Sequence, residues 1–264
     1  MANVSKTQKN VEQKLPSEVV DLPSKGHFYD NDNPLSSGQV EIKYMTAKEE
    51  DILTSVNLIN QGVVIDKLLD ELIVDKKINQ EDLLLGDKNA LLVGARILAY
   101  GKNYEFSYMD LYEQEIKGKV DLSKLKEKNI DLSKVEKGQT LFSFTLPKTK
   151  REITFELSTV KSENDIQIEI DAINKVYKDS NVDRAKSTRL KHIIKTIDGN
   201  ADRQTINNFV DNEFLSVDAL AFREYIKEIT PDIIMDTTIK NSQGGEEKVT
   251  VPITVEFFWP GIEL

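Results

Sequence analysis

The sequence contains no cysteine, so it offers no thiolate that could serve as a nucleophile, a disulfide partner or a zinc ligand. It has only two histidines, which leaves few side chains that titrate near neutral pH. A positive charge balance is also missing, because the formal net charge is -10 and the sequence pI is about 4.9. Such a surface repels phosphate backbones, so a nucleic-acid partner is not expected.

Long hydrophobic runs are lacking as well. No segment approaches the ~18 apolar residues that a membrane-spanning helix needs, and the N-terminal residues form no apolar signal segment. We therefore expect no membrane contact and a location in the cytoplasm. Hydrophobic residues make up 39% of the sequence and charged residues 30%, a balance typical of a globular protein that buries a core.

The usual sequence signatures of an active site are absent too. There is no glycine-rich phosphate loop and no Gly-x-Ser-x-Gly motif. His27 lies in a segment rich in proline and glycine, where a turn is expected. His192, with Asp198 or Asp202, is the best candidate for a catalytic group, but no nucleophile accompanies it. We predict no catalytic, cofactor or metal site, and an enzyme with an unrecognised site is the alternative.

Hydrophobic periodicity predicts an α+β fold, with a mainly helical body and two small antiparallel β-hairpin modules. Thr46 and Glu49 have the spacing of a capping box and should begin a helix. The other predicted helices span residues 63–74, 88–100, 163–177, 188–197, 203–212 and 217–229, the last capped by Ser216. The predicted strands span residues 39–44, 104–108, 116–122, 141–146, 153–157, 233–239 and 248–259.

These elements divide the chain into five predicted segments. They are a flexible N-terminal arm (1–16), an extended segment with a short strand and a helical group (17–101), a β-hairpin module (102–160), a second helical group (161–230), and a C-terminal hairpin with an aromatic tail (231–264).

The aromatic tail consists of Phe257, Phe258 and Trp259. These residues either lock the tail onto the chain's own core or contact another protein. Strand alternation places Phe257 on the buried face and Phe258 on the opposite face. We therefore predict burial for Phe257. Phe258 and Trp259, together with Phe28 and Tyr29, are candidate partner contacts, because aromatic side chains bury a large area at protein interfaces.

Phrases at both ends of the sequence carry a resemblance to a known family. Residues 21–29 (DLPSKGHFY) and 40–53 (VEIKYMTAKEEDIL) resemble the N-terminus of the baseplate hub assembly proteins of T-even-type contractile-tailed bacteriophages. Residues 222–231 (FREYIKEITP) and 255–260 (VEFFWP) resemble the far end of the same family. The order matches over nearly the whole chain from residue 17 onward.

The resemblance implies a late phage protein that helps to build the central hub of the tail baseplate. It would act by binding other hub or tape-measure proteins, in the host cytoplasm during assembly and then in the virion. A transient chaperone that is absent from the mature virion is the alternative. Family members often carry cysteine pairs in both hairpins, which look like zinc ribbons. Here residues 108–111 and 241–244 have no thiolates, so we expect apolar strand faces to hold the hairpins.

Overall fold

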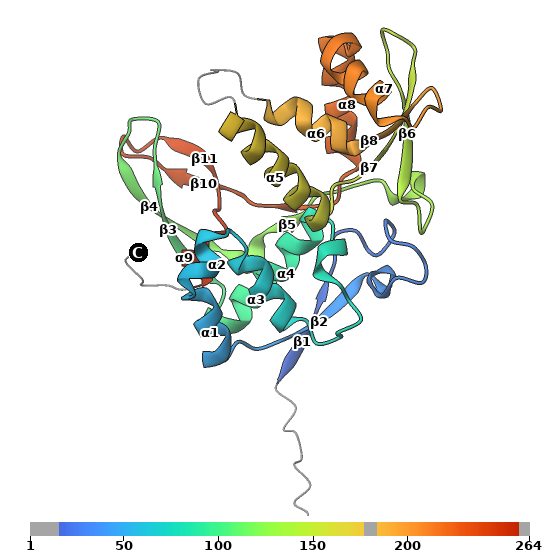
Figure 1. Cartoon of the computed structure of the whole chain (residues 1–264). Coiled ribbons are helices and arrows are strands. Elements are labelled where there is room, and N and C mark those ends of the chain that lie inside the picture. The colour runs from blue at the N-terminus through green and yellow to red at the C-terminus, as the bar shows by residue number, and fades with distance from the viewer. Residues whose placement is uncertain (1–15, 177–183, 259–264) are drawn as a thin grey trace, which may run out of the picture.

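The structure, a computed structural model, describes residues 16–176 and 184–258 (Figure 1). It combines helices with small antiparallel sheets of two or three strands, which confirms the α+β prediction. Trp259 and all of the predicted arm except Pro16 lie outside the described residues. Among the helices that are described, none is both long and apolar enough to span a bilayer.

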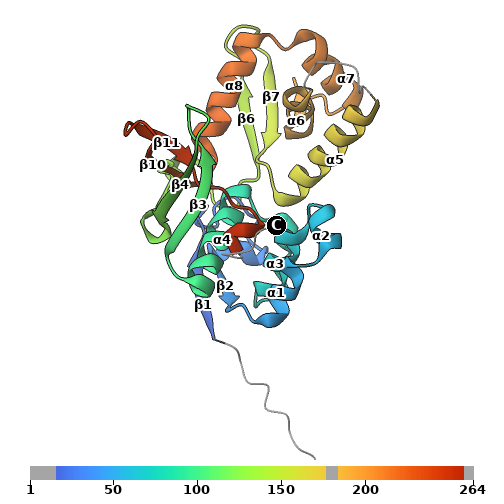
Figure 2. The ribbon, with the colours of Figure 1, turned by 90° about the vertical axis from the view of Figure 1, so that its left-hand side faces the viewer.

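The N-terminal half pairs a two-stranded sheet with four helices (Figure 2). Its elements are β1 (Ser17–Asp21), β2 (Gln39–Lys43), α1 (Ala47–Leu53), α2 (Val56–Asn60), α3 (Val64–Leu72) and α4 (Leu85–Tyr100), with short 3-10 turns at Pro34–Ser37 and Gln80–Asp82. Strand β2 and helices α1, α3 and α4 were predicted. Strand β1 was not, because its side chains do not alternate between buried and exposed.

Helix α4 is the central element of this half, and it contacts both strands and the C-terminal part of the chain. Gly86, in its first turn, lies against the backbone of Pro231. A Cβ at Gly86 would come within 2.1 Å of the Pro231 carbonyl oxygen, so only glycine permits this approach. The start of α4 is thereby joined to a segment that lies far away in the sequence.

The predicted capping box at α1 is confirmed. The Glu49 carboxylate accepts hydrogen bonds from the amide and the hydroxyl of Thr46, and it also pairs with Lys43 at 2.7 Å. Glu49 is buried, and burial by itself would raise its pKa. The hydrogen bonds from Lys43 and Thr46 outweigh burial and lower the pKa of Glu49 to about 2.

Glu49 should therefore make folding sensitive to acid. Its folded-state pKa lies below the ordinary value of 4.5, so its contribution is complete above that pH and is lost as the pH falls towards 2. At ~1.4 kcal/mol per pKa unit, the contribution of Glu49 to the free energy of unfolding should fall by about 3 kcal/mol over this window. Urea denaturation at a series of pH values measures it.

The matched control is Glu49→Gln. Burial raises the pKa of Asp87, so protonation of Asp87 favours the folded state and opposes the effect of Glu49 in acid. Only the difference in the free energy of unfolding between wild type and Glu49→Gln isolates the contribution of Glu49. That difference should shrink as the pH falls, and a constant difference across the window would contradict the prediction.

Two hairpins stand side by side at the edge of the molecule and extend away from the helices (Figures 1 and 2). One is formed by β3 (Asn103–Met109) and β4 (Glu115–Asp121), the other by β10 (Asp236–Lys240) and β11 (Glu246–Thr250). Strand β4 contacts β10, and Ile239 packs over Gly118. The segment that follows β4 and the segment that precedes β10 are joined by a small sheet of two strands, β5 (Lys126–Glu127) and β9 (Ile233–Ile234).

The C-terminal helical group packs on a three-stranded sheet. Its elements are β6 (Leu141–Thr145), β7 (Glu152–Glu156), β8 (Ile194–Ile197), α5 (Val160–Val176), α6 (Ala185–Ile193), α7 (Arg203–Asn208), a π-helical turn (Phe209–Glu213) and α8 (Ser216–Ile229). The predicted β6–β7 hairpin and the predicted helices near α5, α7 and α8 are found. Ser216 begins α8, and Leu215 takes the N-cap position.

The helix predicted over residues 188–197 is wrong in its second half. Residues 194–197 form β8, which pairs with β7. Ile194 and Ile197 are buried, and the hydroxyls of Thr196 and Thr154 are hydrogen-bonded across the strands at 2.7 Å. Of residues 194–197, Ile194, Thr196 and Ile197 are β-branched and fit a sheet surface. Pairing with β7 therefore favours a strand here over a continued helix.

The strand predicted over residues 248–259 is also wrong beyond Thr250. Pro252 lacks a donor for a strand ladder, and the chain leaves the hairpin there. A short helix, α9 (Val255–Phe258), then packs against α4. The helical turn places Phe257 and Phe258 in the protein interior together, and neither ring is exposed to solvent. The tail therefore locks onto the chain's own core up to Phe258.

One cluster of buried hydrophobic residues extends through the described molecule. It includes Leu22, Leu91, Phe155, Phe222 and Phe257. The four predicted segments that follow the arm all contribute to this cluster. The aromatic rings in it make edge and tilted contacts, for example between Phe155 and Phe222 at 4.9 Å between centroids.

Candidate partner-binding surfaces

Phe28 and Tyr29, two of the predicted partner contacts, are buried in the structure. The Phe28 ring lies 5.9 Å from that of Phe142. The Tyr29 hydroxyl donates to Asp87 Oδ2 at 2.5 Å and accepts the Leu84 amide at 2.9 Å. Burial, with the Asp87 charge beside it, raises the pKa of Tyr29 well above its ordinary value. In this conformation both side chains anchor their loop and are almost wholly buried.

The loop around them, residues 22–29, is built on one buried carboxylate. Asp87 Oδ1 accepts the Ser24 amide at 2.9 Å, while Oδ2 holds Tyr29. The His27 amide donates to the Ser24 carbonyl at 3.0 Å, so the turn expected at His27 is present. Gly26 has a φ of 75°, and a Cβ there would lie 2.3 Å from the Ser36 carbonyl oxygen. The serine, glycine and tyrosine in residues 22–29 are thus explained by the conformation of the loop itself.

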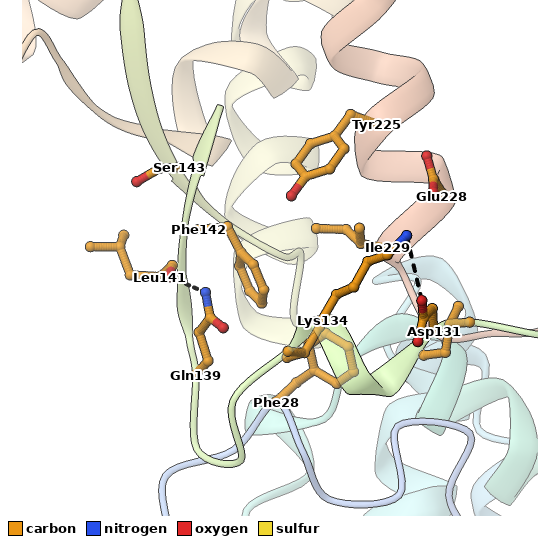
Figure 3. A pocket seen from close by; sticks show the side chains of 12 residues that line it. Phe28, Asp131, Lys134, Gln139, Leu141, Phe142, Ser143, Tyr225, Glu228 and Ile229 are labelled. Carbon is orange, nitrogen blue, oxygen red and sulfur yellow. Dashed lines mark hydrogen bonds and ion pairs between the residues drawn. The ribbon is translucent and has the colours of Figure 1, made fainter. Parts of the chain in front are cut away.

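A groove with a volume of about 360 Å³ lies between α8 and the segment that leads into β6 (Figure 3). Phe28, Phe142, Tyr225 and Ile229 form its apolar walls. Its polar lining includes Asp131, Lys134, Gln139 and Glu228. Asp131 pairs with Lys134 at 3.4 Å, and Gln139 donates to the Leu141 carbonyl at 3.1 Å. The groove has the shape and chemistry to accept an apolar side chain.

The turn between β3 and β4 exposes three large apolar side chains. Leu111 is 79% exposed, Met109 62% and Tyr112 54%. Sequence reasoning did not single out these residues as candidates. The sequence places Met109, Leu111 and Tyr112 in or beside a short turn between two predicted strands, but it does not show whether another segment covers them. Several large apolar side chains that are exposed together are a more specific mark of a protein-binding site than one such side chain alone.

Asp110 holds this turn in place. Its Oδ1 accepts the amides of Tyr112 and Gln114, both at 2.9 Å, and its Oδ2 accepts the amide of Ser242 at 2.9 Å. Burial would raise the pKa of Asp110, but these hydrogen bonds outweigh it and lower the pKa to about 2. Ser242 belongs to the turn of the other hairpin, so one carboxylate joins both turns.

The hydrogen bond from Ser242 to Asp110 corrects the expectation that apolar strand faces alone hold the hairpins. The bond from Ser242 to Asp110 links the two segments in which the family resemblance implied cysteine pairs. With no cysteine in the sequence, thiolate ligation of zinc is impossible here. Among the residues that are described, no group of three or more His, Asp or Glu side chains is placed to hold a metal ion.

The structure does not bring together the residues of the alternative catalytic site. His192 Nε2 lies 2.7 Å from Glu169 Oε2, which connects α6 to α5. Asp198 instead accepts hydrogen bonds from Arg151 and from the Glu152 amide. Asp202 caps α7 through the Thr205 amide at 2.8 Å. Each of these side chains thus has a local structural contact.

Comparison with known proteins gives one match. The family described as T4 bacteriophage base plate protein matches residues 17–259. No curated protein and no solved structure matches the chain. The matched range includes the phrases at residues 21–29, 40–53 and 222–231 and all but the last residue of the phrase at 255–260, and it includes the hairpins and the groove. Because it covers most of the chain, this protein belongs to the family of T4 bacteriophage base plate proteins.

Proposed function

We propose that this protein is a subunit or assembly factor of the central hub of the phage tail baseplate. It acts by binding other tail proteins, with hub and tape-measure proteins as the expected partners, and it carries out no catalytic step. Its place of action is the host cytoplasm during assembly, followed by the tail baseplate. The family membership supports the baseplate setting. The sequence phrases at residues 21–29 and 222–231 support the hub in particular.

The observation that carries the binding role is the exposed turn between β3 and β4. Apolar side chains exposed in a turn lower solubility. The backbone of this turn is fixed by hydrogen bonds to Asp110. A turn that is already ordered loses little conformational entropy when it binds, which favours its use as a docking element. The groove beside α8 offers a second apolar surface for an assembly partner.

The test is a phage in which this gene is interrupted, complemented by a tagged copy of the full chain. Without complementation, we expect infected cells to accumulate tail proteins but no complete hubs, as seen by electron microscopy and mass spectrometry of the particles. Complete, infectious tails in the absence of the protein would contradict the proposal.

Mass spectrometry of purified virions then separates a subunit from a chaperone. Peptides of this protein in stoichiometric amount in the mature virion identify a permanent subunit. Peptides that occur in assembling hubs but not in virions identify a transient factor, the alternative that the sequence leaves open.

A further inference from the structure

The paired turns of the two hairpins form a strongly acidic rim around an apolar tip. The tip consists of Met109, Leu111 and Tyr112, and the rim consists of the exposed or partly exposed carboxylates of residues 113–115 and 246–247. The rim carries Glu113, Glu115, Glu246 and Glu247, while Lys240, opposite Glu246 in the strand register, and Lys248 flank it, so the acidic groups outnumber the basic ones. Glu115 lies directly opposite Met109 in the strand register, so charge and apolar surface are adjacent.

We propose that this tip inserts into an apolar pocket with a lysine- or arginine-rich rim on another tail protein. This inference rests on the proposed function and names the chemistry of the partner. Exposed aliphatic and aromatic side chains supply the area that is buried on binding. The surrounding carboxylates select a cationic rim and attract it over a distance of about a Debye length.

The charge balance of the chain argues against a second copy as the occupant. The net charge of the whole sequence is -10, so two copies meeting at this tip would place acidic surfaces together. The same repulsion disfavours nucleic acid. A different protein with a basic rim is the occupant that the charges favour.

The geometry of the turn fits this role. Three amides bind the Asp110 carboxylate, and Glu113 adopts a left-handed backbone conformation with a φ of 58°. The bond to Ser242 ties the turn to the second hairpin, and Glu247 accepts the Leu111 amide at 3.4 Å. The backbone of the turn is thus held by these hydrogen bonds, and the two hairpins extend away from the helices (Figure 1).

The first experiment maps what the tip contacts. A photo-crosslinking amino acid replaces Leu111 in the full-length chain, which is supplied to infected cells that lack the wild-type protein. The control position is Ile168 on α5, which is 68% exposed but far from the hairpins in the sequence. We expect a crosslink from position 111, and none from position 168, to an apolar segment of one tail protein that is flanked by lysine or arginine. A crosslink to an acidic segment, or to any part of a second copy of this chain, would overturn the proposal.

The second experiment measures the contribution of the tip. Wild-type and variant chains, labelled with different isotopes, compete for incorporation into assembling baseplates in cells that lack the native gene. The double variant Leu111→Ser with Tyr112→Ser should be under-represented about 30-fold, the effect of removing an interface hot spot. Ile168→Ser should be incorporated equally with wild type. Equal incorporation of the double variant would refute the inference.

The charge variant is Glu113→Gln with Glu115→Gln and Glu246→Gln. It should slow association with isolated hub intermediates about 10-fold at low salt, and the difference should vanish at high salt. A rate that is independent of these charges would overturn the basic-rim part of the proposal. If the wild-type protein itself does not enter baseplates, the proposed function is wrong. If it does enter and these variants behave like wild type, only the inference about the hairpin tip is wrong. All variants should unfold at the wild-type temperature, because the altered side chains lie at the surface.

Discussion

Replacing Asp87 by alanine should lower the free energy of unfolding by about 2–6 kcal/mol, from ~1–3 kcal/mol for each buried group left without a partner. The Ser24 amide and the Tyr29 hydroxyl would both lose their acceptor in the protein interior. Urea denaturation followed by circular dichroism measures the loss. Hydrogen exchange should show faster exchange at residues 22–29, because this loop depends on Asp87 for its position.

The matched controls are Asp87→Asn and Tyr29→Phe. Asparagine keeps the size of the side chain and one acceptor oxygen, so Asp87→Asn should destabilise less than Asp87→Ala. The effects of Asp87→Ala and Tyr29→Phe should not add, since both remove the same hydrogen bond. A stability of Asp87→Ala close to that of wild type would show that the loop is held by other contacts.

Replacing Phe258 by alanine should cost about 3–5 kcal/mol in the isolated protein, the usual loss for truncating a buried phenylalanine. Phe258 has no solvent exposure, and its ring makes an edge contact with Phe257 at 5.1 Å between centroids. Phe257 in turn contacts Tyr104 at 4.8 Å. Loss of the ring would leave a cavity between α9 and α4. Thermal and urea unfolding of the purified variant provide the measurement.

The control for Phe258→Ala is Leu111→Ala. Leu111 is large, apolar and exposed, so its truncation should change stability by less than ~0.5 kcal/mol. If Phe258 were instead a partner contact, Phe258→Ala would behave like Leu111→Ala and weaken only binding. Equal stability of the two variants would therefore contradict the burial of the tail.

The two wrong secondary-structure predictions have the same cause. Residues 188–197 show a helical spacing of apolar side chains, and residues 248–257 alternate as a strand. Local periodicity does not contain the contacts that decide these segments. Pairing with β7 turns residues 194–197 into a strand, and packing on α4 turns residues 255–258 into a helix. In both segments tertiary contacts override the local pattern.

The candidate sites show the same limit. Aromatic residues at Phe28, Tyr29 and Phe258 suggested partner contacts, yet all three are buried. Three of the exposed large apolar residues, Met109, Leu111 and Tyr112, lie instead at the tip of the β3–β4 hairpin, in or beside the segment where missing cysteines had been noted. The bond from Ser242 to Asp110, which fixes their turn against the second hairpin, joins residues 132 positions apart and is not contained in the local sequence.

The sequence by itself determined the chemistry that this protein lacks and the class to which it belongs. The absence of cysteine excludes thiolate sites, the acidic balance disfavours phosphate partners, and the order of its phrases indicates a baseplate protein. The capping box at Thr46 is equally local, because its hydrogen bonds span three residues. Only the tertiary structure decided which apolar side chains reach solvent. Exposure depends on what distant segments cover, and Asp87 and Asp110 bind amides far away in the sequence.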